Sequence, residues 1–168
     1  MSDAGGLHLV DEEQTHAAAS RVARALAGEA GPVVLHLSGE LGAGKTTFAR
    51  GLLRGLGVTG SIRSPSYTLV EEHAAGRWEA LHLDLYRLEA SDALEELGLR
   101  DRHRPGTLML IEWPEKAHPR GLPPADLVLK FHLGSGGHEL EAEARSAAGG
   151  ALLQALLAAS PDENGLSP

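Results

Sequence analysis

A glycine-rich segment in the first third of the chain contains the residue types that hold a chain of phosphates. Residues 39–46 read GELGAGKT and match the phosphate-binding pattern G-x-x-x-x-G-K-S/T, the P-loop. Glycines let such a loop turn tightly and point its backbone N–H groups at dense negative charge. Its lysine can reach the β- and γ-phosphates, and the hydroxyl after it can bind Mg²⁺. The motif predicts a nucleoside triphosphate site formed by Gly42, Ala43, Gly44, Lys45, Thr46 and Thr47.

Two carboxylates further along the chain are candidates for the hydrolytic half of such a site. A P-loop ATPase needs one acidic group near Mg²⁺ and one group that orients the attacking water. Glu112 directly follows the apolar run 108–111, and ligands of open α/β sheets bind where buried strands end. We therefore predict that Glu112 holds Mg²⁺, directly or through water, together with Thr46. The alternative is a charge at the start of a helix before Pro114.

Asp84 is the second candidate, because it is an acid inside the apolar run 81–85, which reads LHLDL. A charge in such surroundings needs a partner or a function. The functional interpretation is orientation of water or an outer contact to Mg²⁺, and the alternative is an ion pair with Arg87. With Lys45 and Glu112, Asp84 completes the predicted set of catalytic residues.

Two neighbouring features have less specific signals. Ser64, Pro65 and Thr68 lie in a loop that can respond to a γ-phosphate, as switch loops do, or that can be an ordinary turn before a strand. Trp113, next to Glu112, can stack near the base, meet a partner protein or lie in the core. Both features stay open on the sequence alone.

The P-loop motif is diagnostic only between a strand and a helix, and the flanking residues meet that condition. Residues 32–38 begin apolar and β-branched, while Phe48, Leu52 and Leu53 share one helical face. A glycine-rich turn without a ligand is the alternative. Residues 67–85 are expected to form an antiparallel hairpin, and residues 108–111 a central buried strand. The expected strands are residues 7–10, 32–38, 67–72, 78–85, 108–111, 126–133 and 138–145, and the expected helices are residues 11–26, 47–55, 91–97 and 146–159.

The composition limits the classes of function. The chain has 168 residues, enough for one domain over residues 1–160, and we expect the polar tail 161–168 to be disordered. The net charge is −8, with 23 acidic and 15 basic side chains, which argues against a surface that grips nucleic acid directly. There are no cysteines, which excludes disulfides and cysteine nucleophiles, and none of the nine histidines is in an H-E-x-x-H zinc motif.

Two motifs that the sequence lacks limit the choice of nucleotide and of cellular location. GTPases read guanine with N-K-x-D, and the only asparagine is Asn164 in the tail, so ATP is favoured over GTP. There is no basic, apolar leader and no apolar run long enough to span a membrane. We therefore expect a soluble cytoplasmic protein.

Four segments in combination resemble the TsaE family, the small ATPases of bacterial tRNA threonylcarbamoyladenosine biosynthesis. They read GELGAGKTTF at 39–48, SPSYTLV at 64–70, DLYRL at 84–88 and IEWP at 111–114, and they occur in the family's order within about residues 7–159. The resemblance implies an α/β P-loop NTPase fold with a mixed, mostly parallel sheet flanked by helices. It also implies slow, Mg²⁺-dependent ATP hydrolysis that drives a conformational reset of a complex of the partner proteins TsaB and TsaD. In that complex TsaD, not this chain, would modify the tRNA. The acidic balance of the chain predicts only an indirect contact with tRNA, and the alternative is a local contact through the basic cluster from Arg100 to Arg104.

The family pattern implies the same roles for the residues selected above. Lys45 and Thr46 would contact phosphate and Mg²⁺, Glu112 would hold Mg²⁺, and Asp84 would act in hydrolysis. The pattern adds Thr15 near the adenine, whereas the place of Thr15 in the expected helix alone suggests an exposed residue.

The chain departs from the family at one turn. The family often has glycine followed by arginine at a late strand turn near the nucleotide, and here the pair is Gly137 and His138. A phosphate or base contact from this position would then depend on the charge of His138.

Two other functions use the same phosphate-binding motif. A nucleoside or small-molecule kinase usually carries an arginine-rich lid, and Arg100, Arg102 and Arg104 resemble a fragment of one. A turn at residues 105–106 follows at once, however, and no acceptor motif is present. A non-catalytic nucleotide-binding scaffold would instead tolerate the loss of Lys45 and Glu112.

Overall fold

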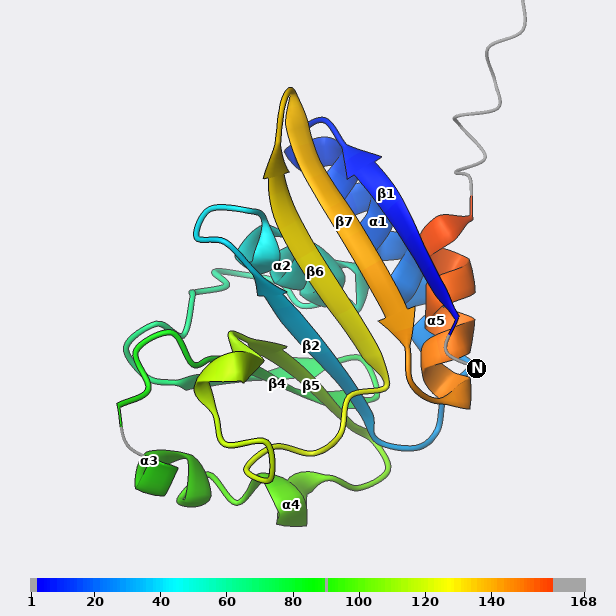
Figure 1. The fold of residues 1–168 in the computed structure, drawn as a ribbon. Helices are drawn as coiled ribbons and strands as arrows, with labels where there is room; N and C mark the ends of the chain where they lie inside the picture. The colour runs from blue at the N-terminus through cyan, green and yellow to red at the C-terminus, as the bar shows by residue number, and fades with distance from the viewer. Residues whose placement is uncertain (1–2, 90, 159–168) are drawn as a thin grey trace, which may run out of the picture.

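The computed structural model describes residues 3–89 and 91–158, which form a seven-stranded sheet with helices on both faces (Figure 1). The expected tail 161–168 lies outside the described residues. The sheet order is β1-β7-β6-β2-β5-β4-β3. The strands are β1 (Ala4–Leu9), β2 (Val33–Gly39), β3 (Val70–Ala75), β4 (Trp78–Asp84), β5 (Thr107–Glu112), β6 (Leu127–Gly134) and β7 (Gly137–Ala144). The helices are α1 (Glu12–Leu26), α2 (Lys45–Gly55), α3 (Ser91–Glu95), α4 (Leu99–Arg102), the 3₁₀ turn η1 (Pro114–Lys116) and α5 (Ala147–Leu157).

Most strands of the sheet run in one direction. Strands β6, β2, β5 and β4 are parallel neighbours at its centre. Antiparallel pairing adds β3 at one edge and β7 then β1 at the other, so that only β3 and β7 run against the rest. The expected α/β class with a mixed, mostly parallel sheet is therefore confirmed, as are the hairpin of β3 with β4 and the central position of β5.

The core lies on both faces of the sheet, which explains why β5 is a continuous apolar run. Helices α1, α2 and α5 cover one face, where Leu108 and Leu110 of β5 join their cluster. On the other face, Met109 and Ile111 pack in a second cluster with residues of α3, α4 and the segment before β6. A strand covered on both faces has no solvent side, so its side chains do not alternate with polar ones. No helix among the described residues has the length and apolar character needed to cross a membrane.

Side-chain capping bonds set the starts of two helices close to the expected residues 11 and 146. The Asp11 carboxylate accepts the Gln14 N–H at 2.9 Å and begins α1, which ends at Leu26. The Ser146 hydroxyl accepts the Gly149 N–H at 3.0 Å and begins α5. Each bond satisfies one of the N–H groups that a helix start leaves without a partner.

Several expected boundaries are wrong; the first strand, for example, begins at Ala4 and not at residue 7. For two others, backbone conformation gives the reason. Strand β3 starts at Val70 and not at residue 67, because Leu69 has a φ of 65° and its N–H closes a turn to the Pro65 carbonyl at 2.9 Å. The expected helix 91–97 ends at Glu95, and a separate helix α4 follows. Gly98 lies between them with a φ of 61°, a left-handed conformation that breaks a continuous helix.

A half-buried histidine on β2, His36, should make folding stability depend on pH. Burial lowers the pKa of His36 below its ordinary value of 6.5, and the positive charge of Arg145 lowers it further. A hydrogen bond to the Pro123 carbonyl and the negative charge of Asp126 raise the pKa, but the net shift is downward. The folded state therefore resists protonation while the unfolded chain takes up the proton, so stability is present above about pH 6.5 and decreases as pH falls. When the pH is lowered from about 7.5 to 5.5, the free energy of unfolding should decrease less in His36→Gln than in the wild type. The two decreases should differ by at most about 1.4 kcal/mol per pH unit.

Urea denaturation at the two pH values measures this difference. The exposed His16 supplies the matched control, because His16→Gln removes an imidazole from the surface and should lose as much stability as the wild type. Equal losses in His36→Gln and the wild type would contradict the assignment.

Candidate functional site

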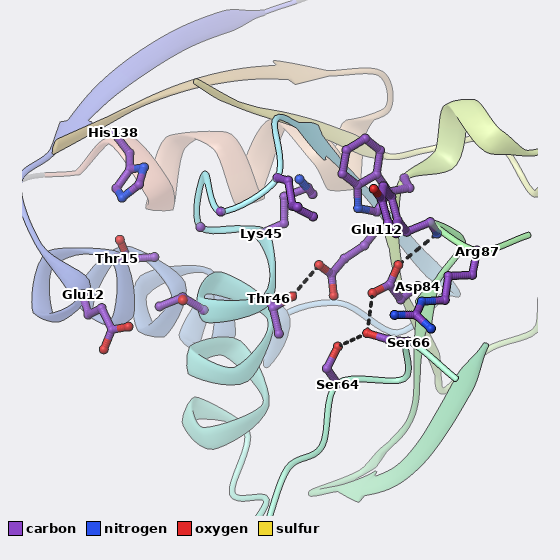
Figure 2. A pocket seen from close by; sticks show the side chains of 16 residues that line it. Glu12, Thr15, Lys45, Thr46, Ser64, Ser66, Asp84, Arg87, Glu112 and His138 are labelled. Carbon is purple, nitrogen blue, oxygen red and sulfur yellow. Dashed lines mark hydrogen bonds between the residues drawn. The ribbon is translucent and has the colours of Figure 1, made fainter. Parts of the chain in front are cut away.

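A cavity of about 420 Å³ lies beyond the C-terminal ends of β2, β4 and β5, where open α/β sheets bind ligands (Figure 2). Each residue predicted to bind the nucleotide or Mg²⁺ or to act in catalysis lines it except Ala43, which is buried. The lining residues are Glu12, Thr15, Leu41, Gly42, Gly44, Lys45, Thr46, Thr47, Ser64, Ser66, Asp84, Tyr86, Arg87, Glu112, Trp113 and His138. Segments far apart in the sequence therefore meet in one place.

The loop after β2 has the backbone geometry that only glycine permits. Gly39 has a φ of 133°, and a Cβ there would lie 2.1 Å from the Phe131 carbonyl oxygen of β6. Gly44 has a φ of 108° and directly precedes α2. The first bond of that helix runs from the Phe48 N–H to the Gly44 carbonyl, so the N–H groups of residues 45–47 have no acceptor within the helix. Free N–H groups at a helix start form a site for an anion.

Lys45 is directed at the loop itself. Its Nζ donates to the carbonyls of Gly39 at 2.6 Å and Glu40 at 2.8 Å, and it lies 4.1 Å from the centre of the Trp113 ring. Burial lowers the pKa of Lys45 below its ordinary value of 10.5. Several acidic neighbours raise this pKa in turn, and the negative charge of Glu112 contributes the most among them. Two neutral carbonyls are weak partners for an ammonium group, and phosphate oxygens would bind it more strongly.

Thr46 and Glu112 meet directly. The Thr46 hydroxyl donates to Glu112 Oε1 at 2.7 Å, and Glu112 Oε2 lies 2.6 Å from Nε2 of the buried His82 (Figure 2 shows the first of these bonds). The carboxylate does not cap the turn η1, whose N-cap residue, Trp113, makes no side-chain capping bond. The alternative of a helix-start charge therefore does not match the structure, and His82 is a contact that the sequence analysis missed.

Asp84 lies opposite Glu112 in the register of β4 with β5. Its Oδ1 accepts the Tyr86 N–H at 3.0 Å, and its Oδ2 accepts the Ser66 hydroxyl at 3.3 Å. No ion pair joins Asp84 to Arg87 within the described residues, and the Arg87 guanidinium instead lies 4.3 Å from the Tyr67 ring centre. The ion-pair alternative for Asp84 is therefore not supported.

The loop before β3 reaches the site through serines. Ser64 and Ser66 line the cavity, and their hydroxyls lie 2.8 Å apart. Pro65 and Thr68, which were also predicted, do not line it, and the Thr68 hydroxyl donates to Glu71 at 3.3 Å. Ser66 is thus the contact from this loop that reaches Asp84, and the sequence analysis did not select it.

The other end of the cavity is lined by Glu12, Thr15 and His138 (Figure 2). The position of Thr15 in the helix suggested an exposed side chain, which is wrong: Thr15 is 3% exposed, and its hydroxyl donates to the Asp11 carbonyl at 3.2 Å. Trp113 is half-buried, in contact with Lys45 and with its ring centre 4.9 Å from that of Tyr86. Trp113 therefore combines a partly buried position with a place beside Lys45, at the phosphate end of the cavity.

Two of the three arginines that resembled a lid fragment, Arg102 and Arg104, are directed elsewhere. Arg102 pairs with Glu72 and Glu79, Arg104 lies 3.6 Å from Glu79, and neither lines the cavity. These contacts hold α4 and the turn after it against the hairpin of β3 with β4. The observation weakens the kinase alternative.

The residues present fit a nucleotide with Mg²⁺ better than a metal held by protein alone. In the described part of the chain, no three His, Cys, Asp or Glu side chains are grouped as metal ligands. Mg²⁺ does not need such a group, because it keeps waters and takes substrate phosphates beside one or two protein oxygens. The hydroxyl of Thr46 and the carboxylate of Glu112 supply two hard oxygen ligands next to the P-loop.

Comparison with known proteins identifies similar chains. The family model "Threonylcarbamoyl adenosine biosynthesis protein TsaE" matches residues 9–141. The TsaE protein of Haemophilus influenzae is 44% identical over 99 residues, which are 59% of this chain and 62% of that protein. The TsaE protein of Aquifex aeolicus is 34% identical over 127 residues, 74% of this chain and 84% of that protein.

A solved structure also matches. YdiB of Bacillus subtilis has a TM-score of 0.72 and 29% identity, with 93% of this chain and 95% of that one covered. Some curated relatives are matched over less of their length, as with the Bacillus subtilis TsaE protein, of which 49% is aligned at 44% identity. The chain thus spans about half to three-fifths of several of the relatives that it matches.

Proposed function

The chain belongs to the TsaE family of tRNA threonylcarbamoyladenosine biosynthesis proteins, and on that premise we propose that it is a Mg²⁺-dependent ATPase of this pathway. The observation that carries the proposal is the meeting of Thr46 with Glu112 at 2.7 Å beside a loop with P-loop geometry. A hydroxyl, a carboxylate and a lysine around free helix N–H groups are the parts that a triphosphate with its metal requires.

We propose a role for each group of the site. The N–H groups at the start of α2 and the Lys45 ammonium would bind the β- and γ-phosphates. Thr46 and Glu112 would hold Mg²⁺, which when bound neutralises charge on the phosphate oxygens. Asp84 Oδ2, within reach of Ser66, would orient the water whose oxygen attacks the γ-phosphorus as the bond to the β–γ bridging oxygen breaks. ADP and phosphate would then leave.

The base is assigned to the end of the cavity with Thr15, Glu12 and His138. This leaves adenine as the favoured base, because the sole asparagine of the chain, Asn164, is followed by Gly-Leu-Ser and so forms no N-K-x-D motif. His138, where the family often has arginine, would give this end a weaker or charge-dependent contact.

Hydrolysis by the chain alone should be slow, because among the described residues only one arginine lines the cavity, and it makes no hydrogen bond or ion pair with the P-loop. Arg87 lines the cavity but stacks on Tyr67. We propose that a complex of TsaB and TsaD completes the site, that ATP turnover resets the conformation of this complex in the cytoplasm, and that TsaD performs the transfer. The net charge of −8 supports an indirect contact with tRNA.

The ATPase rate of the chain, measured with and without TsaB and TsaD, tests this function. We expect slow turnover alone and a rise of about tenfold or more with both proteins, since a group supplied by a partner typically accelerates such sites strongly. Full-speed turnover by the isolated chain would exclude partner dependence. A phosphorylated product in a screen of nucleosides and sugars would instead favour a kinase.

A further inference from the structure

His82 is a fully buried polar residue that the reaction scheme above does not use. It lies on β4 two residues before Asp84, so both side chains are on the same face of the strand. In the parallel register, His82 is opposite Leu110 while Asp84 is opposite Glu112. The His82 imidazole therefore approaches the Glu112 carboxylate from the sheet interior, whereas the cavity lies on the other side, at the C-terminal ends of the strands.

The Glu112 carboxylate is held from both sides. It is 1% exposed, and a buried carboxylate is costly unless its oxygens accept hydrogen bonds. Thr46 donates to Oε1 from the front at 2.7 Å, and His82 Nε2 lies 2.6 Å from Oε2 at the back. Only the front oxygen is shared with a residue of the P-loop.

The surroundings of His82 indicate which ring nitrogen carries the proton. His82 Nδ1 is buried and has no hydrogen-bond partner among the described residues. A proton on Nε2 faces an acceptor, whereas a proton on Nδ1 would be a buried donor without one. The geometry thus favours the Nε2–H tautomer, with His82 as the donor to Glu112.

We propose that His82 is a positioning residue that orients Glu112 so that Oε1 faces Thr46 and the Mg²⁺ site. The inference rests on the proposed function, because it assigns Glu112 to Mg²⁺. A glutamate has three side-chain torsions, and a second donor behind it removes the freedom to turn away from the metal. Carboxylates that bind metals are commonly held in this way, and loss of the outer partner typically costs about 10–100-fold in metal affinity or activity.

Two substitutions separate positioning from a merely structural role. His82→Gln keeps a side-chain N–H near the place of Nε2, whereas His82→Asn has its N–H near the place of Nδ1, too short to reach Glu112. Both variants bury an amide in place of the ring, so their effects on thermal stability should be similar. Their effects on Mg²⁺ should differ.

The readout is calorimetric binding of a non-hydrolysable ATP analogue with and without Mg²⁺, rather than turnover. In His82→Asn the apparent affinity for Mg²⁺ in the presence of the analogue should fall about 10–100-fold, while metal-free binding of the analogue stays near that of the wild type. His82→Gln should recover most of the loss. Wild-type Mg²⁺ affinity in His82→Asn, or equal losses in both variants, would overturn the inference.

A second measurement needs no variant. In ¹⁵N NMR spectra of the wild type, His82 should show the Nε2–H tautomer, and an Nδ1–H tautomer would overturn the inference. Failure of the proposed function is distinguishable from either result: the wild type would then bind the analogue equally well with and without Mg²⁺, and both proposals would be rejected together.

Discussion

Lys45→Ala should lower the affinity for ATP by about 100-fold and reduce turnover below detection. The Lys45 ammonium is the only basic group that contacts the P-loop carbonyls in the described part of the chain, through Gly39 and Glu40. Charge-assisted bonds to two phosphate oxygens contribute about 1.5 kcal/mol or more each, and about 1.4 kcal/mol corresponds to a factor of ten in affinity. Calorimetry with the ATP analogue and a phosphate-release assay measure the two effects.

The control for this experiment is another lysine. Lys130 is exposed on β6 and does not line the cavity, so Lys130→Ala removes the same charge without touching the loop. It should bind the analogue and hydrolyse ATP as the wild type does. Lys45→Ala should also remain folded, because it removes a buried cation whose burial already disfavours the charged form.

The pathway gives a second readout for Lys45→Ala. In cells that depend on this chain, the variant should fail to support the modification of tRNA. If the variant supports modification as well as the wild type does, the chain acts as a scaffold and ATP turnover is not its function. If the variant still binds the analogue but no longer hydrolyses ATP, Lys45 stabilises the transition state of phosphate transfer and contributes little to the binding of ATP.

The phosphate end of the site was predictable because its parts are contiguous in sequence. Gly44, Lys45 and Thr46 need only a strand before them and a helix after them, and both were readable from short apolar patterns. Glu112 was predictable because it follows an apolar run, at the edge of a sheet where ligands bind, and Asp84 because it is an acid inside an apolar run. Their direct opposition depends on the register of β4 with β5, which no local pattern contains.

The residues that were missed depend on contacts between elements. His82 contacts Glu112 only because β4 and β5 are parallel neighbours in one particular register. Thr15 was expected to be exposed, although it lies three and four residues before Ala18 and Ala19 and so continues the buried stripe of α1. The start of β3 was missed because a leucine at a positive φ, as at position 69, is rare and has no sequence signature.

Glu112→Gln should lower turnover by about 10²–10³-fold, the size of effect seen when one preorganised charge-stabilising group is removed. The amide can accept the His82 N–H with its oxygen and donate to the Thr46 hydroxyl with its nitrogen, so this variant should fold nearly as well as the wild type. It lacks the negative charge that holds Mg²⁺, and its half-saturating Mg²⁺ concentration should rise. Glu112→Ala should in addition lose about 1–3 kcal/mol of stability, because it leaves the buried His82 donor without a partner.

Asp84→Asn is the matched comparison, because Asp84 lies opposite Glu112 and the two open roles for it predict different kinetics. If Asp84 orients water, the variant loses turnover while its half-saturating Mg²⁺ concentration stays at the wild-type value. If it supports the metal from outside, that concentration rises as in Glu112→Gln, by a smaller factor. A Mg²⁺ titration of the ATPase rate for the three proteins separates these cases. If Glu112→Gln shows the turnover and Mg²⁺ dependence of the wild type, Glu112 does not hold the metal. Asp84, which accepts a bond from Ser66 of the loop before β3, would then be the acid that responds to the γ-phosphate.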